Sequence, residues 1–371
     1  MSAGALDGIR IADFGRVLAA PYATMLLADL GAEVVKVERP GVGDETRSWG
    51  PPWTAGQATY FLAVNRNKTS CSLDLATEHG RAGAHELVAS CDVVVQNFRA
   101  GTMEKLGLGY EQLATLRPDL VYCSVTGFGS AAGADLPGFD LVVQAVGGLM
   151  SVTGTPDSPS KVGVALVDVV TGLHAALGIL AALRHRDRTG HGQHVEVDLL
   201  SSLLSAMTNQ AAAYLATGRA PQAMANQHPS IAPYEVLRTA DRPLVVAAGN
   251  DRIFARLAAS LGRPGLATDA RYATNAARVA HREELVAELE AVLVTAPAER
   301  WFADLSAAGV PCGPINDLGE AFALADRLGL HPVVELGTDA GETVRTVANP
   351  VRLSATPASY RCAPPLLEET P

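Results

Sequence analysis

Short apolar runs alternate with helical patterns through the first 125 residues, and this alternation constrains the fold more than any other feature. IRIADF (9–14) has the composition of a buried strand. The next segment, PYATMLLADLG, has Pro21 early in a helix, where its missing N–H is harmless, and Gly31 just past the helix end. EVVKVE (33–38) has the composition of a second strand. This order predicts a parallel strand pair joined by a right-handed crossover.

The same alternation continues to residue 129. Further strand-like runs are TSCSLDL (69–75), DVVVQNF (92–98) and LVYCSVTGFG (120–129). Helical patterns separate them at 77–89 and near 111–116. Strands that alternate with helices in this way predict an α/β fold built on a doubly wound, Rossmann-like parallel sheet.

A different pattern begins after about residue 220, where PYEVLRTADRPLVVAAGND offers two strands around a polar turn at 240–242. Three helical patterns follow, near 251–261, 281–293 and 297–308. A chain of 371 residues is also long for one hydrophobic core. We therefore predict a large α/β domain at 1–220, a smaller α+β domain at 221–320, and a C-terminal segment at 321–371 that returns to the large domain.

Charge and cysteine usage exclude several classes of protein. A net charge of −10 argues against a general nucleic-acid binder, which needs a basic surface. The five cysteines are widely spread without a CxxC pair, and the spacing of His185, His191 and His194 does not suit zinc, so we expect neither a disulfide framework nor a metal. The apolar stretch 162–183 carries Asp168, a costly residue for a membrane helix. Without a signal peptide, a cytoplasmic protein is expected.

The common nucleotide and nucleophile motifs are missing from the sequence. The first strand–helix junction, DFGRVLAAPY, has one glycine where a dinucleotide fingerprint needs three, and there is no P-loop or GxSxG motif. Arg39, Arg47 and Lys68 follow predicted strands. Because ligands of open α/β folds bind beyond the strand ends, these three cations are candidate anion binders.

Asp168 is the most unusual titratable residue, because it interrupts the apolar run VGVALVDVVTG (162–172). An ionised carboxylate that is buried without a partner costs free energy. Such a residue is therefore expected to cap a helix, to pair with a cation, or to take part in catalysis. The flanking pattern predicts a strand before Asp168 and a helix after it, with the carboxylate as the helix N-cap. A carboxylate at a helix start is stabilised as the anion and is also a usable nucleophile, so capping and catalysis both remain open.

Taken together, the segments resemble the family III CoA-transferases, the group of formyl-CoA transferase and carnitine CoA-transferase. The resemblance runs from about residue 5 to 355 and includes LDGIRIADFGRVLAAPYATMLLADLGAEVVKVERPGVGD, NRNKTSCSLDL, DVVVQNFRAGTMEKLGLGY, PGFDLVVQAVGGLMSVTG, RTGHGQHVEVDLL and GVPCGPIND. It implies a two-domain α/β protein that forms an interlocked homodimer. It also places the catalytic aspartate of the family on Asp168.

The implied reaction transfers CoA from an acyl-CoA thioester to a carboxylic acid without metal. Asp168 attacks the thioester to give a mixed anhydride, CoA thiolate converts it to an aspartyl-CoA thioester, and an incoming acid reverses the steps. Asp140 corresponds to an acidic residue of the family near the nucleophile, and the resemblance implies that it has a helper role in catalysis. The resemblance also implies contacts to CoA from Ala19, Arg39, Leu73, Asn97, Phe98 and Lys105, and a substrate pocket that includes Leu18, Trp49, Phe139 and Gly249.

The chain departs from formyl-CoA transferase at four of these family positions. Leu18 replaces a glutamine near the reacting carbonyl, Ala76 and Pro137 replace lysines, and Lys105 replaces an arginine. These changes bear on how the CoA phosphates are anchored and on part of the oxyanion stabilisation.

Two alternatives share the resemblance to CoA enzymes. An α-methylacyl-CoA racemase of this fold needs two acid/base groups, and one of them is a histidine at the position of Phe139, which cannot transfer a proton. A non-catalytic acyl-CoA binding protein has no use for the carboxylate of Asp168. The transferase is therefore favoured over both.

Overall fold

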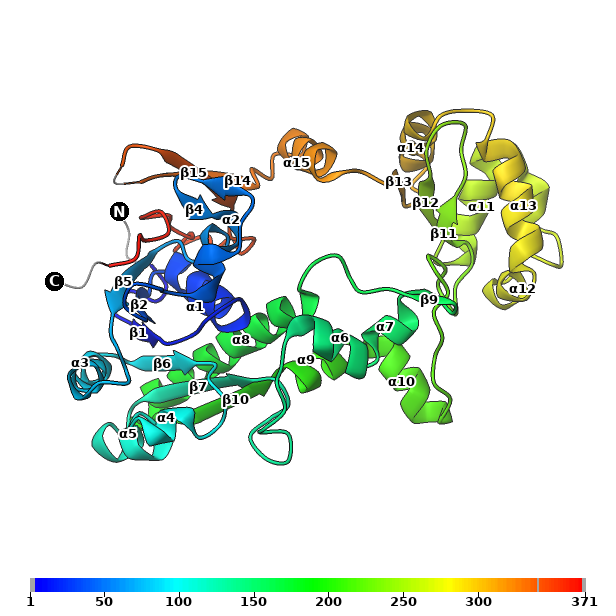
Figure 1. Ribbon diagram of the computed structural model, residues 1–371. Helices are drawn as coiled ribbons and strands as arrows, with labels where there is room; N and C mark the ends of the chain where they lie inside the picture. Colours follow the sequence, from blue (N-terminus) through cyan, green and yellow to red (C-terminus); the bar gives the residue numbers. More distant parts are fainter. Residues whose placement is uncertain (1–3, 339, 369–371) are drawn as a thin grey trace. The chain divides into compact units, whose positions relative to one another are not determined.

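A computed structural model describes residues 4–338 and 340–368 of the chain (Figure 1). The chain forms two compact units. The first unit comprises Met1–Met150, Lys161–Pro221 and His331–Pro371, and the second comprises Ser151–Ser160 and Gln222–Leu330. The C-terminal residues thus belong to the first unit, whereas ten residues within its sequence range, Ser151–Ser160, belong to the second.

The first unit is built on a six-stranded sheet in the order β10-β7-β6-β1-β2-β5. The strands are β1 (Arg10–Asp13), β2 (Glu33–Glu38), β5 (Lys68–Ser72), β6 (Val93–Gln96), β7 (Val121–Thr126) and β10 (His194–Asp198). All neighbouring pairs are parallel, so the predicted α/β fold with a parallel sheet is confirmed. The chain order reverses between β1 and β6, and such a switch point opens a crevice for ligands at the carboxyl ends of the strands.

Helices cover both faces of this sheet because both faces of its strands are apolar. Ile11, Val93 and Val95 pack on one face with helices α1, α8 and α9, and Ala12 and Val94 pack on the other with α3, α4 and α5. These helices are α1 (Ala19–Asp29), α3 (Glu78–Ala89), α4 (Thr102–Lys105), α5 (Tyr110–Leu116), α8 (Leu166–Thr189) and α9 (Leu199–Ala206). Successive side chains of one buried strand therefore pack into two separate cores, one on each face of the sheet.

A close approach on the first face joins α1 and α8. A Cβ added at Gly172 of α8 would lie 2.6 Å from the carbonyl oxygen of Ala19, the first residue of α1. Pro21 follows in the first turn of α1, and Gly31, with φ +118°, lies just past its end, as the sequence predicts. Only glycine fits at position 172, since any side chain would push the two helices apart.

α8 is long and apolar enough to cross a membrane by length and composition, a test that core helices of soluble proteins also pass. One side of this helix, including Val167, Ala175 and Ile179, is buried in the core beside the sheet.

The remaining elements of the first unit surround the sheet. They are η1 (Glu45–Ser48), β3 (Trp53–Thr54), β4 (Gln57–Ala58), α2 (Thr59–Leu62), α6 (Asp140–Val146), α7 (Leu149–Val152, whose end lies in the second unit), α10 (Thr208–Thr217), β14 (Val333–Gly337) and β15 (Thr343–Val347). A buried ion pair between Arg66 and Asp29 fastens the C-terminal segment, because Asp29 also accepts a hydrogen bond from Asn349.

The second unit has its own core around an antiparallel sheet. Strands β11 (Tyr234–Leu237), β12 (Leu244–Ala247) and β13 (Cys312–Pro314) form this sheet, and β8 (Gly154–Thr155) pairs with β9 (Ser158–Pro159). Its helices are α11 (Asp251–Ser260), η2 (Pro264–Ala267), α12 (Asn275–Ala280), α13 (Arg282–Leu293), α14 (Ala298–Ala307) and α15 (Leu318–Arg327). Leu237, Val246, Phe254, Leu289 and Trp301 are part of this core. The α12 helix has no counterpart in the sequence analysis.

We expect Gly172→Val to lower the free energy of unfolding by about 1–3 kcal/mol, because the added methyl groups must displace α8 from α1. Urea unfolding followed by circular dichroism measures this loss. Gly337→Val on β14 is the matched control, since no atom lies within 4 Å of a Cβ added there. An equal loss in both variants would contradict the explanation by close contact.

Candidate active site

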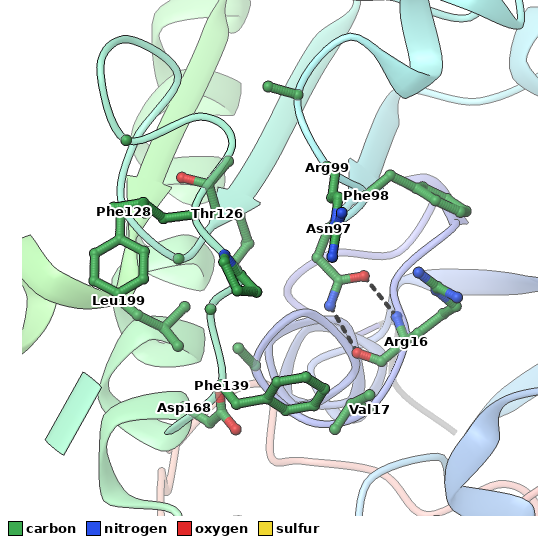
Figure 2. Close-up of a pocket in the computed structure, with 18 of the residues that line it drawn as sticks. Arg16, Val17, Asn97, Phe98, Arg99, Thr126, Phe128, Phe139, Asp168 and Leu199 are labelled. Atoms are coloured by element: carbon green, nitrogen blue, oxygen red, sulfur yellow. Dashed lines mark hydrogen bonds between the residues drawn. The ribbon is translucent and has the colours of Figure 1, made fainter. Parts of the chain in front are cut away.

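A cavity of about 270 Å³ opens at the carboxyl edge of the parallel sheet (Figure 2). Residues 16–19 line it after β1, residues 97–100 after β6, and residues 125–129 at the end of β7. These are the strands on and beside the switch point, where the fold itself leaves room for a ligand. Asp168 also lines this cavity.

A second cavity of about 410 Å³ adjoins the first. Residues 36–39 and 42–45 line it at the end of β2 and beyond, and residues 73–76 line it after β5. Arg16, Glu45 and Phe98 line both cavities. The two cavities therefore form one extended candidate site along the carboxyl edge of the sheet.

Asp168 is not the cap of its helix, which corrects the sequence-based expectation. α8 begins at Leu166, so Asp168 is in its first turn, and the N-cap residue is Ala165, which has no capping side chain. Residues 161–165 form no strand, which is a second correction, and Val164 is 63% exposed. An apolar run without a neighbouring strand to pair with does not form a ladder, whatever its composition.

Asp140 supplies the missing cap from another helix. Its Oδ1 atom accepts hydrogen bonds from the backbone N–H of Val167 at 2.8 Å and of Asp168 at 3.4 Å. Its Oδ2 atom accepts a hydrogen bond from Gln144 at 2.6 Å. Asp140 therefore fixes the start of α8 and, with it, the backbone that carries Asp168.

The carboxylate of Asp168 has no hydrogen-bond donor or cation beside it among the residues that the structure describes. Burial and, to a smaller extent, the negative charge of Asp140 together raise the pKa of Asp168 to about 7. A carboxylate with a raised pKa is more basic, and it is poorly solvated when ionised. Both properties favour a nucleophile or a base at this position.

Two close contacts at glycines position Asp168 and residues 136–139 in the wall of the cavity. Asp168 and Gly172 are four residues apart on one face of α8, so the contact of Gly172 with Ala19 brings Asp168 to the start of α1. A Cβ added at Gly127, after β7, would lie 2.6 Å from the Cα atom of Gly138. This second contact holds residues 136–139 across the loop after β7, where they line the cavity beside Asp168.

The structure brings together most of the site residues that the sequence analysis names. Leu18, Ala19, Asn97, Phe98, Phe139 and Asp168 line the first cavity, and Arg39, Leu73 and Phe98 line the second. Asp140 lies behind Asp168 as a cap. Lys105 ends α4 and Trp49 follows η1, and neither lines the two cavities. Gly249 belongs to the second unit.

Asn97 has a structural task that its sequence position did not reveal. Its Oδ1 accepts a hydrogen bond from the backbone N–H of Arg16 at 2.9 Å, and its Nδ2 donates one to the carbonyl oxygen of Arg16 at 2.7 Å (Figure 2). Asn97 therefore clamps the loop between β1 and α1. The next residue, Phe98, packs its ring against the Arg16 guanidinium at 4.7 Å.

Two of the candidate anion binders are already neutralised by internal partners. Arg47 donates to both carboxylate oxygens of Glu38, and the fully buried Lys68 pairs with Asp13 at 3.0 Å. Neither residue lines the cavities, so both expectations are wrong. Their charges serve the fold, because a buried charge is stable only with a partner.

Two residues that line or influence the site were missed. Arg16 lines both cavities and pairs with Glu45 at 3.1 Å on the surface. Burial raises the pKa of Tyr60, and the charges of Asp168 and Asp140 raise it further, so its hydroxyl lies in their field. Arg16 follows the first strand directly, a position that could have pointed to it, whereas no local signal marks Tyr60.

The sequence matches CoA-transferase family III over residues 6–370. It is 43% identical to the succinate–glutarate CoA-transferase of Agrobacterium fabrum, with 98% of this chain and 93% of the relative covered. It is 40% identical to the acetyl-CoA:oxalate CoA-transferase of Acetobacter aceti, with 95% and 90% covered. A solved CAIB/BAIF family protein from Brucella suis is similar at a TM-score of 0.87 and 41% identity, with 99% of this chain and 97% of that chain covered.

The match is not confined to one motif or one unit. It extends from the first strand of the parallel sheet to the C-terminal segment, and it includes the extended site at the carboxyl edge of that sheet. Sequence relatives and a solved structure agree in covering nearly the whole chain. The chain belongs to CoA-transferase family III, and it is an enzyme that moves CoA between carboxylic acids.

Proposed function

We propose that Asp168 carries out this transfer through covalent intermediates. The observation that carries the proposal is a half-buried carboxylate in the first turn of α8, lining a cavity, with a pKa raised to about 7 and no internal partner among the described residues. A structural carboxylate at this depth would be expected to have a donor or a cation. An attacking group must instead keep its lone pairs free.

The proposed reaction runs through two exchanges at the Asp168 carboxyl group. The carboxylate attacks the thioester carbonyl, a C–O bond forms, and CoA leaves as thiolate to give the mixed anhydride. The thiolate then attacks the aspartyl carbonyl, the acyl group leaves as a carboxylate, and Asp168 carries CoA as a thioester. An incoming carboxylate attacks this thioester and reverses the sequence, which regenerates Asp168 and conserves the energy of the thioester.

The two adjoining cavities divide the substrate between them in this proposal. The thioester end lies in the first cavity beside Asp168, and the rest of CoA follows the second cavity past Leu73 and Arg39. Ala76 and Pro137 line the site where formyl-CoA transferase has lysines, so Arg16 and Arg39 are the arginines that we assign to the CoA phosphates. Lys105 adds long-range positive charge at most, since it lines neither cavity.

We infer that the acids exchanged are small carboxylates, dicarboxylates in particular. Relatives of about 40% identity are named for glutarate, succinate and oxalate. A screen of succinyl-CoA and acetyl-CoA against a panel of mono- and dicarboxylic acids tests this inference. Phe139 in the cavity wall leaves no acid/base group at the place where the racemase alternative needs one.

We further propose that the enzyme is a cytoplasmic homodimer whose subunits interlock. Support comes from the face of α8 that turns away from the sheet, where Leu173 is 47% and Leu177 is 65% exposed. Leu141 and Val146 of α6 and Leu215 of α10 add exposed apolar side chains. A second copy of the chain would cover a face of this kind.

Asp168→Ala is expected to lower kcat for CoA exchange by about 10³-fold or more, because no other group can form the acyl intermediate. Initial rates with succinyl-CoA and a responsive acid measure it. Asp187→Ala, an exposed residue at the far end of the same helix, is the matched control and should keep wild-type rates. Wild-type exchange by the Asp168→Ala protein would disprove the covalent route.

Hydroxylamine added during turnover should convert Asp168 to a hydroxamate. The reagent attacks the activated carbonyl of the anhydride or thioester and releases the carboxylate or CoA. Peptide mass spectrometry locates the adduct, and the reaction without acyl-CoA is the control. An adduct on another residue, or none during active exchange, would contradict the assignment.

The rate should depend on pH through Asp168. With a pKa of about 7 in the free enzyme, kcat/KM should fall about tenfold per pH unit below 7, because only the carboxylate attacks.

The free energy of unfolding should fall as the pH rises, whereas the rate should increase. A carboxyl pKa raised by folding costs stability progressively as the pH rises from about 4 to 7, since the unfolded chain gives up the proton more readily.

Asp168→Asn should therefore stabilise the protein by about 1–3 kcal/mol at pH 8, and the gain should fade toward pH 4. Thermal unfolding of both proteins at several pH values measures the difference. A constant difference across this range would show that the carboxyl group does not titrate as described.

Leu177→Arg should convert the dimer to monomers, since it places a charge in the proposed apolar interface. Light scattering after gel filtration should give twice 38.6 kDa for the wild type and about 38.6 kDa for the variant. A wild-type monomer would overturn the proposed assembly.

A further inference from the structure

The loop between β1 and α1 contains a valine in a backbone conformation that valine rarely adopts. Val17 has φ +66°, in the left-handed region that β-branched side chains avoid. Val17 lines the first cavity (Figure 2). Leu18 and Ala19, the next two residues, line the same cavity. Such a conformation persists only where the surrounding structure imposes it.

One buried ion pair makes hydrogen bonds to this loop. Lys36 of β2 and Asp44 lie 2.9 Å apart, and both side chains are fully buried. Lys36 Nζ donates a hydrogen bond to the carbonyl oxygen of Gly15 at 2.7 Å. The backbone N–H of Val17 donates to the Asp44 carboxylate, at 3.2 Å from Oδ2. The pair thus grips the loop on both sides of Arg16.

The ion pair is poorly explained as a device for stability alone. Removing two charges from water costs free energy that their attraction often fails to recover, so apolar residues would serve the core equally well. The carboxylate of Asp44 also accepts hydrogen bonds from the backbone N–H and hydroxyl of Thr46. Its full set of partners makes it rigid, and rigidity is what a strained loop requires.

We propose that the Lys36–Asp44 pair is a positioning device for the transfer reaction. It holds Val17 in the left-handed conformation and thereby fixes the start of α1, Leu18 and Ala19, in the cavity that Asp168 lines. The inference rests on the proposed role of Asp168. Lys36 and Asp44 line the second cavity, which we assign to the part of CoA away from the thioester. In this proposal they act on the reaction through the loop and touch no reacting atom.

A double-mutant cycle between Asp44→Asn and Val17→Gly tests the proposal. Asp44→Asn in the wild-type background should lower kcat by about 10- to 100-fold, since a small displacement of groups at the reacting centre has effects of this size. The KM for acyl-CoA should change by less than about threefold. In the Val17→Gly background the same substitution should lower kcat by less than about threefold, because glycine adopts φ +66° without strain.

Asp29→Asn is the matched control. Asp29 is also fully buried in an ion pair, with Arg66 of the same unit, and it makes no hydrogen bond to the loop. Urea unfolding should show losses of stability in both Asp29→Asn and Asp44→Asn, while kcat falls only in the second. Asp44→Glu, which keeps the charge but moves the carboxylate, is the alternative variant if Asp44→Asn does not fold, and its effect should depend on residue 17 in the same way.

Three results would overturn the inference: an Asp44 effect of equal size in both backgrounds, a rise in KM without a fall in kcat, or an equal fall in kcat for Asp29→Asn. The second result would mean that the pair contacts CoA directly. The rate of hydroxamate formation separates this inference from the proposed function. Absence of any adduct at Asp168 in the wild type refutes the covalent route, whereas slower formation of the same adduct in Asp44→Asn supports positioning.

Discussion

The contact of Gly172 with the start of α1 is the constraint on which the site depends. α8 packs against the sheet along one side, and it approaches α1 so closely that only a glycine fits opposite Ala19. One turn earlier on the same face of the helix lies Asp168. The packing of α8 against α1 therefore also places the Asp168 carboxylate at the carboxyl edge of the sheet. The switch point between β1 and β6 leaves a crevice there.

Asp140 links the stability of α8 to the chemistry of Asp168. It caps the helix start with its carboxylate, which accepts hydrogen bonds from the N–H groups of Val167 and Asp168. The same negative charge opposes ionisation of Asp168 nearby. Asp140 thus fixes the backbone at the start of α8 and also raises the pKa of the Asp168 side chain. The helper role in catalysis that the family resemblance implies for Asp140 stays a prediction.

The parallel sheet was predictable strand by strand, whereas the segment before Asp168 was not. Runs such as 33–38 and 92–98 are both apolar and flanked by helices, so their partners are set by the crossover rule. Residues 162–165 are also apolar, yet none of the strands in the described part of the chain pairs with them. The prediction that Arg47 and Lys68 bind anions was wrong for a related reason. Their loop positions suggested free cations, but Glu38 and Asp13 neutralise them within the fold.

The sequence by itself determined the alternation of strands and helices, the parallel sheet, and the choice of Asp168 as the candidate nucleophile, because apolar periodicity and helix-end residues act locally. Tertiary structure alone decided that Asp168 has no compensating donor or cation among the described residues, that Asp140 caps α8, and that Lys36 and Asp44 bond to the loop at Val17. Burial and charge proximity decide these features. Both depend on residues that are distant in the chain and adjacent only after the helices have packed on the sheet.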